Sequence, residues 1–130
     1  MGDAGLLEAN KGAVRRFYAA MNARDVDAIV ELYAPQAKIF VMAPGAFSGE
    51  LAPSRELTQA FLAAFPQLVF EVGAMTAEGD RVAVEASSRG KRADGTPYRN
   101  HYHNVFVFRA GRVLLLREYP TGLETSAEAR

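Results

Sequence analysis

The residue best suited to chemistry in this sequence is Glu118, which lies near the end of a predicted strand. Strand alternation places its side chain on one face with Leu116 and Leu114, so the carboxyl group would have apolar neighbours. Removal from water disfavours the charged form of a carboxyl group and raises its pKa toward the range useful for proton transfer. The alternative is a solvated Glu118, or one paired with Arg117 or Arg99.

A second set of candidate residues lies on the strand predicted over residues 98–108. Alternate side chains of a strand point to opposite faces. One face carries Asn100, Tyr102, Asn104, Phe106 and Phe108, and the other carries His101, His103, Val105 and Val107. We expect the first face to line a pocket, where Tyr102 and Asn104 would be the polar groups that orient a ligand. Tyr102 could equally be a core residue with a satisfied hydroxyl group.

His101 and His103 project to one side of this strand and could together bind a metal ion. No further cluster of acids or histidines completes such a site, although Glu85 could lie on a neighbouring strand. We therefore predict no metal and a surface or interface position for the pair. If the strand had the opposite phase, a histidine would line the pocket and act as the base, so both stay candidate pocket residues.

Two apolar stripes with helical spacing predict two short helices near the start of the chain. The stripes comprise Val14, Phe17, Tyr18 and Met21, then Val26, Ile29, Val30 and Tyr33. Asp25 can cap the second helix through its side-chain oxygen, and Pro35 would end this helix.

The rest of the chain predicts one more helix and a series of strands. A strand is expected over 37–43, and the loop over 44–53 could act as a lid. A third helix follows Pro53-Ser54 and ends at Pro66. Four strands then follow, separated by turns at 78–80, 94–95 and 110–111. The order α-α-β-α-β-β-β-β favours an α+β fold with helices packed on one face of an antiparallel sheet.

Composition excludes several classes of protein. The 130 residues, 49% of them hydrophobic, fit a single domain over 1–130 with loose ends near 1–7 and 121–130. A net charge of zero gives no general attraction to nucleic acid or to a membrane, and we expect neither partner. The absence of cysteine excludes disulfides and cysteine-ligated metals. The first residues resemble neither a signal peptide nor a membrane span, which predicts a cytoplasmic protein.

Positive charge gathers late in the chain. Residues 89–117 hold seven Lys or Arg against the single acid Asp94. Solvated strand edges that discourage strand addition are the first interpretation. A site for an anionic ligand is the second.

The order of elements and three local strings resemble the nuclear transport factor 2-like superfamily. The strings are RRFYAAMNARDVDAIVELYAP (15–35), DRVAVEASSRGK (80–91) and YRNHYHNVFVFRAGRVLLLREY (98–119). This superfamily includes SnoaL-like polyketide cyclases, ketosteroid isomerases and phenazine-biosynthesis cavity proteins. The resemblance implies three N-terminal helices on a strongly curved, mostly antiparallel sheet, a cone-shaped arrangement that encloses a deep pocket. It also implies a homodimer formed through the outer face of the sheet.

Two of the family's known sites are incomplete in this sequence. In ketosteroid isomerases a helix tyrosine, a strand aspartate and a second acid form the site, and these positions match Phe17, Val41 and Asn104. Asn104 can still donate a hydrogen bond but is no acid. The SnoaL-like cyclases carry an aspartate just after the last strand, whereas this chain has Pro120-Thr121 there. The sequence thus argues against both of these mechanisms.

The phenazine-pathway proteins offer the better match, at 100–102 and 117–119. In them a glutamate that corresponds to Glu118 lies in the cavity and is thought to act in acid–base work. The resemblance therefore supports Glu118 as the proton-transfer residue, with Asn104 and Tyr102 orienting a substrate oxygen.

These observations predict a protein that binds a small apolar molecule. The predicted pocket residues, besides Glu118, Asn104 and Tyr102, are Phe17, Tyr18, Tyr33, Phe40, Phe61, Phe65, Phe106, Leu116, His101 and His103. The leading hypothesis is an isomerase, cyclase or lyase that acts on an apolar carbonyl compound without a cofactor. The alternatives are a non-catalytic dimeric binding or accessory domain of the same fold, and a protein-interacting adaptor whose pocket is filled by Phe and Leu side chains.

Overall fold

The computed structural model describes residues 2–45 and 47–122, which form three helices and six strands. The helices are α1 (Asp3–Ala23), α2 (Val26–Glu31) and α3 (Arg55–Ala64). The strands are β1 (Tyr33–Val41), β2 (Gly49–Leu51), β3 (Val69–Glu78), β4 (Arg81–Lys91), β5 (Pro97–Arg109) and β6 (Arg112–Glu118).

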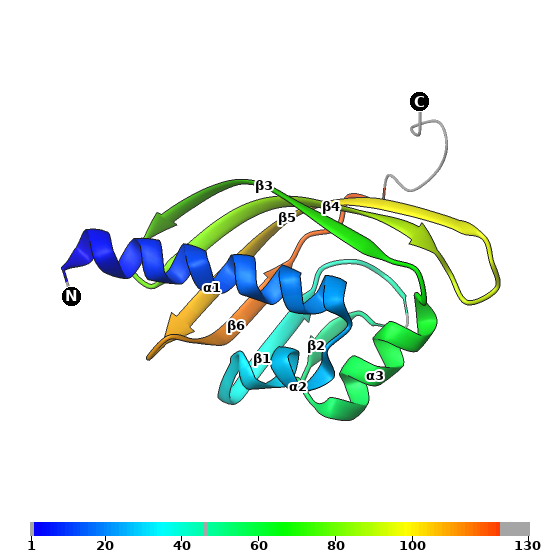
Figure 1. The fold of residues 1–130 in the computed structure, drawn as a ribbon, viewed down its shortest axis with the longest axis horizontal. Helices are drawn as coiled ribbons and strands as arrows, with labels where there is room; N and C mark the ends of the chain where they lie inside the picture. Colours follow the sequence, from blue (N-terminus) through cyan, green and yellow to red (C-terminus); the bar gives the residue numbers. More distant parts are fainter. Residues whose placement is uncertain (1, 46, 123–130) are drawn as a thin grey trace.

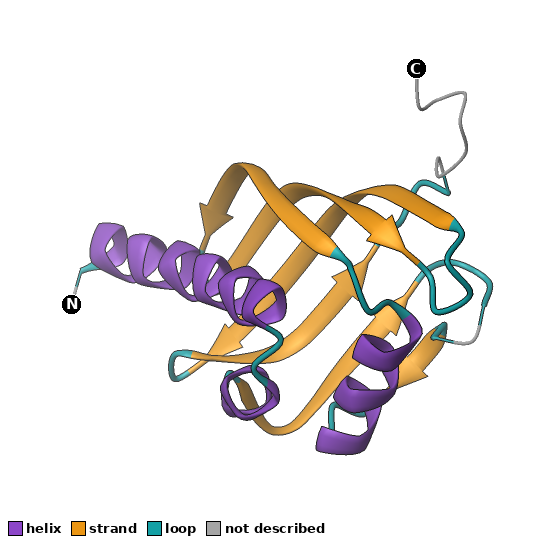
Figure 2. Cartoon of the chain, turned by 45° about the vertical axis from the view of Figure 1, so that its right-hand side comes forward, coloured by secondary structure: helices purple, strands orange, loops and turns teal. Residues whose placement is uncertain are grey.

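All six strands join one curved sheet that does not close on itself. Their order is β2-β1-β6-β5-β4-β3. Only β1 and β6 pair in parallel among the described strands, and every other neighbouring pair is antiparallel. The helices lie on the concave side of this sheet (Figures 1 and 2). The predicted α+β fold, with N-terminal helices on a mostly antiparallel sheet, is confirmed.

Helix α1 carries the predicted stripe and is longer than the stripe alone indicated. Val14, Phe17 and Tyr18 are buried against the sheet. The helix begins at Asp3, so the segment near 1–7, expected to be loose, is helical from Asp3 onward. The first turns lack a long apolar stripe but contain good helix formers. The expected loose tail over 121–130 lies mostly outside the described residues.

Strand β1 begins earlier than predicted. Tyr33 was expected to belong to the second helix and Pro35 to end it, but α2 ends at Glu31 and both residues lie in β1. The pairing of β1 with β6 shifts between Tyr33 and Lys38, and Gln36 has a positive φ of 64°. Such a bulge leaves backbone groups outside the ladder, so it tolerates a proline that cannot donate.

Two further details differ from the predicted strands. The loop expected over 44–53 contains β2, which pairs with β1, so the sheet has one strand more than predicted. A bulge between Val72 and Met75 changes the phase of β3. Met75 therefore packs on the core, whereas Val72 is 38% exposed. Bulges of this kind insert a residue that a strict two-residue period does not reveal.

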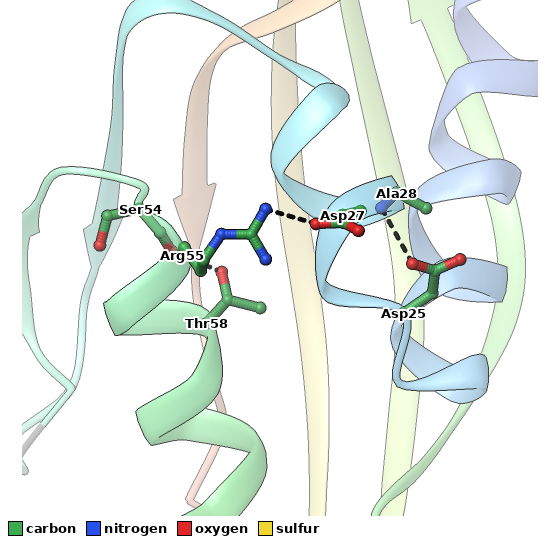
Figure 3. A network of polar contacts seen from close by, with 6 residues as sticks. All are labelled: Asp25, Asp27, Ala28, Ser54, Arg55 and Thr58. Carbon is green, nitrogen blue, oxygen red and sulfur yellow. Dashed lines mark hydrogen bonds and ion pairs between the residues drawn. The ribbon is translucent and has the colours of Figure 1, made fainter.

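Polar contacts hold α3 in place beside α2. Asp27 of α2 forms an ion pair with Arg55 at the start of α3 (Figure 3). Arg24, at the end of α1, donates to the carbonyl oxygen atoms of Leu62 and Phe65 at the other end of α3. A cation at a helix C-terminus satisfies carbonyl groups that have no partner within the helix. Helix α3 is thus fixed at both ends.

The chain that leaves α3 crosses closely over β4 at Gly90. A Cβ atom at Gly90 would lie 1.9 Å from the carbonyl oxygen of Gln67 and 2.8 Å from the Cα of Leu68. Both are backbone atoms, so a side chain could fit only if the backbone moved. Gly90 therefore allows the segment between α3 and β3 to lie against the sheet.

We expect Gly90→Ala to lower the free energy of unfolding by about 2 kcal/mol or more, because the methyl group overpacks this crossing. Urea unfolding followed by circular dichroism measures the change. Gly12→Ala is the matched control, since its Cβ would meet only the Arg16 side chain at 3.6 Å. A helical Gly→Ala change stabilises by about 0.5–1 kcal/mol. Equal effects of the two substitutions would contradict the prediction.

Candidate functional site

A cavity of about 450 Å³ lies between the concave face of the sheet and the helices. Residues from α1, α2, α3, β1, β2, β3, β5 and β6 line it, together with the segments that follow α3, β1, β4 and β6. Nine of the described lining residues are aromatic: Phe17, Tyr18, Tyr33, Phe47, Phe61, Phe65, Phe70, Tyr98 and Tyr102. An apolar cavity with a few polar groups is the usual form of a small-molecule site.

Glu118, the last residue of β6, lines this cavity. Among the described residues its carboxyl group has no hydrogen-bond or ion-pair partner. Burial raises the pKa of this carboxyl group from 4.5 to about 7, because the charged form loses its hydration. Arg117 points to the opposite face, where it lies 5.9 Å from the ring of Phe40. The sequence alternative of a pair between Glu118 and Arg117 is therefore wrong.

Tyr18 presents a hydroxyl group whose proton is directed by Asn104. The Asn104 Oδ1 accepts from the backbone N–H of Tyr119 at 3.1 Å, and its Nδ2 lies 2.9 Å from the Tyr18 hydroxyl oxygen. A backbone N–H can only donate, so the amide oxygen must face Tyr119 and the amide nitrogen must donate to Tyr18. The Tyr18 hydroxyl group accepts there, and its own proton is left to donate elsewhere.

The Tyr18 hydroxyl group remains protonated over the physiological range. Burial raises the pKa of Tyr18 and the nearby charge of Glu118 raises it further. Burial and Glu118 raise the pKa of Tyr33 in the same way. These effects show that both phenols lie near the Glu118 carboxyl group. The arrangement combines an acid with a pKa near neutrality and neutral hydrogen-bond donors.

Asn104 does not itself reach the cavity. It is only 2% exposed and does not line the cavity wall. We predicted that Asn104 orients a substrate oxygen, whereas the structure places it behind Tyr18. Its amide groups are occupied by Tyr18 and Tyr119, so it acts on a ligand only through Tyr18.

Tyr102 lines the cavity, as predicted, but belongs to a separate polar group. Its hydroxyl group lies 2.7 Å from the Ser88 Oγ. Burial raises the pKa of Tyr102, so its phenol stays neutral. The Asn100 Nδ2 donates to the Tyr98 hydroxyl oxygen at 2.9 Å.

The structure resolves which face of β5 points inward. The cavity is lined by Tyr98, Asn100 and Tyr102, and the phase predicted for residues 98–108 is correct. His101 and His103 are exposed on the opposite face, so neither histidine is a pocket residue. Among residues 2–45 and 47–122, no three His, Asp or Glu side chains come together as a metal site.

Five predicted pocket residues line the cavity: Phe17, Tyr18, Tyr33, Phe61 and Phe65. Three others do not. Phe40 lies on the outer face of β1, because Ile39 and Val41 point inward. Phe106 and Leu116 face inward but are fully buried, since they pair across β5 and β6 beneath Phe17. They form the packed core below the cavity floor.

Several lining residues were not predicted from the sequence, among them Phe70, Tyr98 and Arg92. Phe70 is on β3, and Tyr98 continues the inward face of β5 beyond Asn100, so alternation could have revealed both. Arg92, in the turn between β4 and β5, gave no signal because its position depends on how the turn packs against α3.

Comparison with known protein families identifies the family of this domain. The model of the SnoaL-like domain matches residues 14–115, most of the chain. The chain belongs to the SnoaL-like domain family. Its match spans α1 through most of β6 and ends three residues before Glu118. No curated protein matches this SnoaL-like chain in sequence.

Solved structures share the fold of this SnoaL-like domain at low sequence identity. Bal32a, from a soil-derived mobile gene cassette, superposes with a TM-score of 0.80 at 22% identity, over 90% of this chain and 92% of its own. IdmH from Streptomyces antibioticus, a candidate polyketide cyclase, gives 0.74 at 22% identity, over 92% and 97%. A candidate isomerase from Bacillus subtilis gives 0.74 at 24% identity, over 95% and 91%. At these identities the likeness shows the fold alone.

The raised pKa of Glu118 predicts a dependence of stability on pH. The folded state keeps a proton between pH 4.5 and about 7 that the unfolded state has lost. Stability therefore falls as pH rises through this window, by ~1.4 kcal/mol per pH unit and ~3 kcal/mol in all. Glu118→Gln removes the titrating group, so we expect the variant to lack this decline.

The measurement is chemical denaturation of both proteins from pH 4 to pH 8. Glu85→Gln, a change at an exposed position on β4, is the matched control and should follow the wild type. A constant difference between Glu118→Gln and wild type across this range would show that the carboxyl group is not buried.

Proposed function

We propose that this protein is a cofactor-independent enzyme of isomerase, cyclase or lyase type that transfers a proton on an apolar carbonyl compound. The observation that carries the proposal is the Glu118 carboxyl group, which lies in an aromatic cavity with its pKa raised to about 7. A general base is most effective when its pKa lies near the working pH. The SnoaL-like membership and the fold shared with a candidate cyclase and a candidate isomerase are consistent with this class of reaction.

In the proposed reaction, the Glu118 carboxylate takes a proton from the carbon next to a substrate carbonyl group. The electron pair of that C–H bond moves into the carbonyl group and forms an enolate. The Tyr18 O–H group, which Asn104 orients, would donate to the enolate oxygen. The protonated Glu118 then returns its proton to another carbon of the enolate. In a cyclisation, the enolate carbon would instead attack a second carbonyl carbon of the same molecule, whose C=O π electrons move to oxygen, and Glu118 would protonate the alkoxide so formed. Tyr33 would serve as a second donor.

The non-catalytic alternative rests on a different observation. The chain has Val41 and Pro120-Thr121 where isomerases and cyclases of this superfamily carry acids, so a domain that only binds an apolar ligand is the second candidate. Homodimerisation through the outer face of the sheet and a cytoplasmic location also stay predictions. No helix within the described ranges is long and apolar enough to cross a membrane.

We expect the wild type to catalyse exchange of α-protons for deuterium in an enolisable aryl ketone, with 2-acetylnaphthalene and 2-tetralone as probes. Glu118→Gln should reduce the exchange rate to the buffer background, because glutamine cannot accept the proton. Proton NMR in D₂O follows the loss of the α-proton signal. Glu85→Gln should exchange at the wild-type rate. Ketone binding without exchange in the wild type would support the binding domain instead.

We also expect the wild-type exchange rate to rise with pH and reach half its maximum at about pH 7, where half of Glu118 is ionised. Tyr18→Phe should lower the maximal rate by about 10²-fold, since one donor to the enolate oxygen is lost. The pH at which the exchange rate of this variant reaches half its maximum should change little. An unchanged maximal rate in Tyr18→Phe would exclude Tyr18 as the donor.

A further inference from the structure

A second, open depression of about 410 Å³ lies where the start of β3 meets the end of the hairpin between β4 and β5 (Figure 1). Arg89, Lys91 and Arg99 line it, and none of the three lines the cavity that holds Glu118. The even-numbered residues of these strand segments face the cavity side, so alternation directs the three cations to the outer face of the sheet. The depression is therefore a site separate from the cavity.

Three of the seven cations within residues 89–117 lie close together in this depression. Arg89 and Arg99 are directly opposite each other on β4 and β5, a position in which Cβ atoms are about 5 Å apart. Lys91 lies two residues along β4 from Arg89, so it is the diagonal neighbour of Arg99, at roughly 7–8 Å. Like charges directly opposite each other destabilise a sheet. The fold thus keeps a repulsive arrangement that a bound anion would relieve.

Acidic side chains neutralise this cluster only in part. Glu71 of β3 forms an ion pair with Arg89 at 3.6 Å, in which the two side chains are 68% and 62% exposed. Such an exposed pair contributes little and exchanges easily. Lys91 and Arg99 form no ion pair or hydrogen bond with another described residue, and the Oδ1 of Asp94 is engaged within its own turn. Three cations and one paired acid leave a surplus of two positive charges.

We propose that this depression binds a phosphate monoester group. A phosphate monoester carries close to two negative charges near neutral pH, which matches the surplus of the cluster. The forked N–H groups of Arg89 and Arg99 suit the oxygen atoms of a phosphate, and Lys91 adds a point charge. Val69 and Pro97 give the depression apolar sides, against which the organic part of the ligand can lie. This site is independent of the reaction proposed for the cavity.

The test is a titration of the wild-type protein with phenyl phosphate and with phenyl sulfate, which has the same ring but a single negative charge. Two-dimensional ¹H–¹⁵N NMR spectra give the Kd of each probe and identify the residues whose signals move. We expect phenyl phosphate to bind more tightly and to shift the signals of residues 67–69, 89–91 and 97–99. Equal affinity for the two probes would overturn the proposal, as would shifts confined to the residues that line the Glu118 cavity.

Three variants test the residues of this site. Arg99→Gln should weaken binding of phenyl phosphate by about 10-fold, since one charge-assisted contact is lost. Arg81→Gln removes an exposed cation at the other end of β4, outside the depression, and should bind as the wild type does. Glu71→Gln releases Arg89 from its ion pair and should strengthen binding by about 2- to 5-fold. An unchanged Kd in both Arg99→Gln and Glu71→Gln would overturn the proposal.

Vesicles distinguish a soluble phosphate ester from a lipid headgroup. Phosphatidic acid carries the same monoester group, so the protein is sedimented with phosphatidylcholine vesicles that contain or lack it. Binding of phenyl phosphate without co-sedimentation would identify a soluble ester as the ligand. Co-sedimentation that requires both phosphatidic acid and Arg99 would support the same site at a lipid surface. Failure of the wild type to bind either phenyl phosphate or these vesicles would overturn the proposal.

Discussion

The packing of Phe17 against Phe106 sets the distance between α1 and the sheet, and the cavity depends on that distance. The two rings meet edge to face with centroids 5.3 Å apart, and Phe17 also contacts Tyr33 at 6.0 Å. Phe106 is fully buried, so this contact has no room to shift. Next in sequence, Tyr18 points elsewhere and reaches Asn104. One turn of α1 therefore supplies both the ring that sets the distance between helix and sheet, Phe17, and the hydroxyl group of the candidate site, Tyr18.

The candidate site combines groups that stabilise one another and groups that do not. Asn104 is buried and fully satisfied, so it fixes Tyr18 at little cost. Glu118 has no such partner within the described residues, and its charge is disfavoured. A protein that only needed a stable fold would gain by replacing such a carboxyl group. Destabilising features such as this buried carboxyl group concentrate at functional sites.

The sequence predicted the parts of the site that depend on local periodicity. Tyr102 and Glu118 could be assigned to the inner face because their strands alternate regularly near these positions. Tyr33 was assigned to the second helix but begins β1, where a bulge shifts the pairing with β6. No local pattern encodes a bulge, because its position follows from how distant strands pair.

The partners of each polar side chain were beyond what spacing can show. Asn104 was correctly given an inward direction, yet its amide is used by Tyr18, which lies 86 residues away in the chain. Likewise Arg92 reaches the cavity only because its turn is bound to α3. Contacts of this range are set by tertiary packing, and a single sequence does not determine them.

The parallel pairing of β1 with β6 has a consequence for the way the protein reaches its native state. Val41 pairs with Glu118, so the strand that carries the carboxyl group joins a strand from the first third of the chain. Pairings between such distant segments form late and slow the folding of a domain. Until β6 docks, the sheet does not cover the aromatic faces of α1 and α3, which can then contact other unfolded chains. The strand that completes the cavity is thus also the one whose docking shields this apolar surface from aggregation.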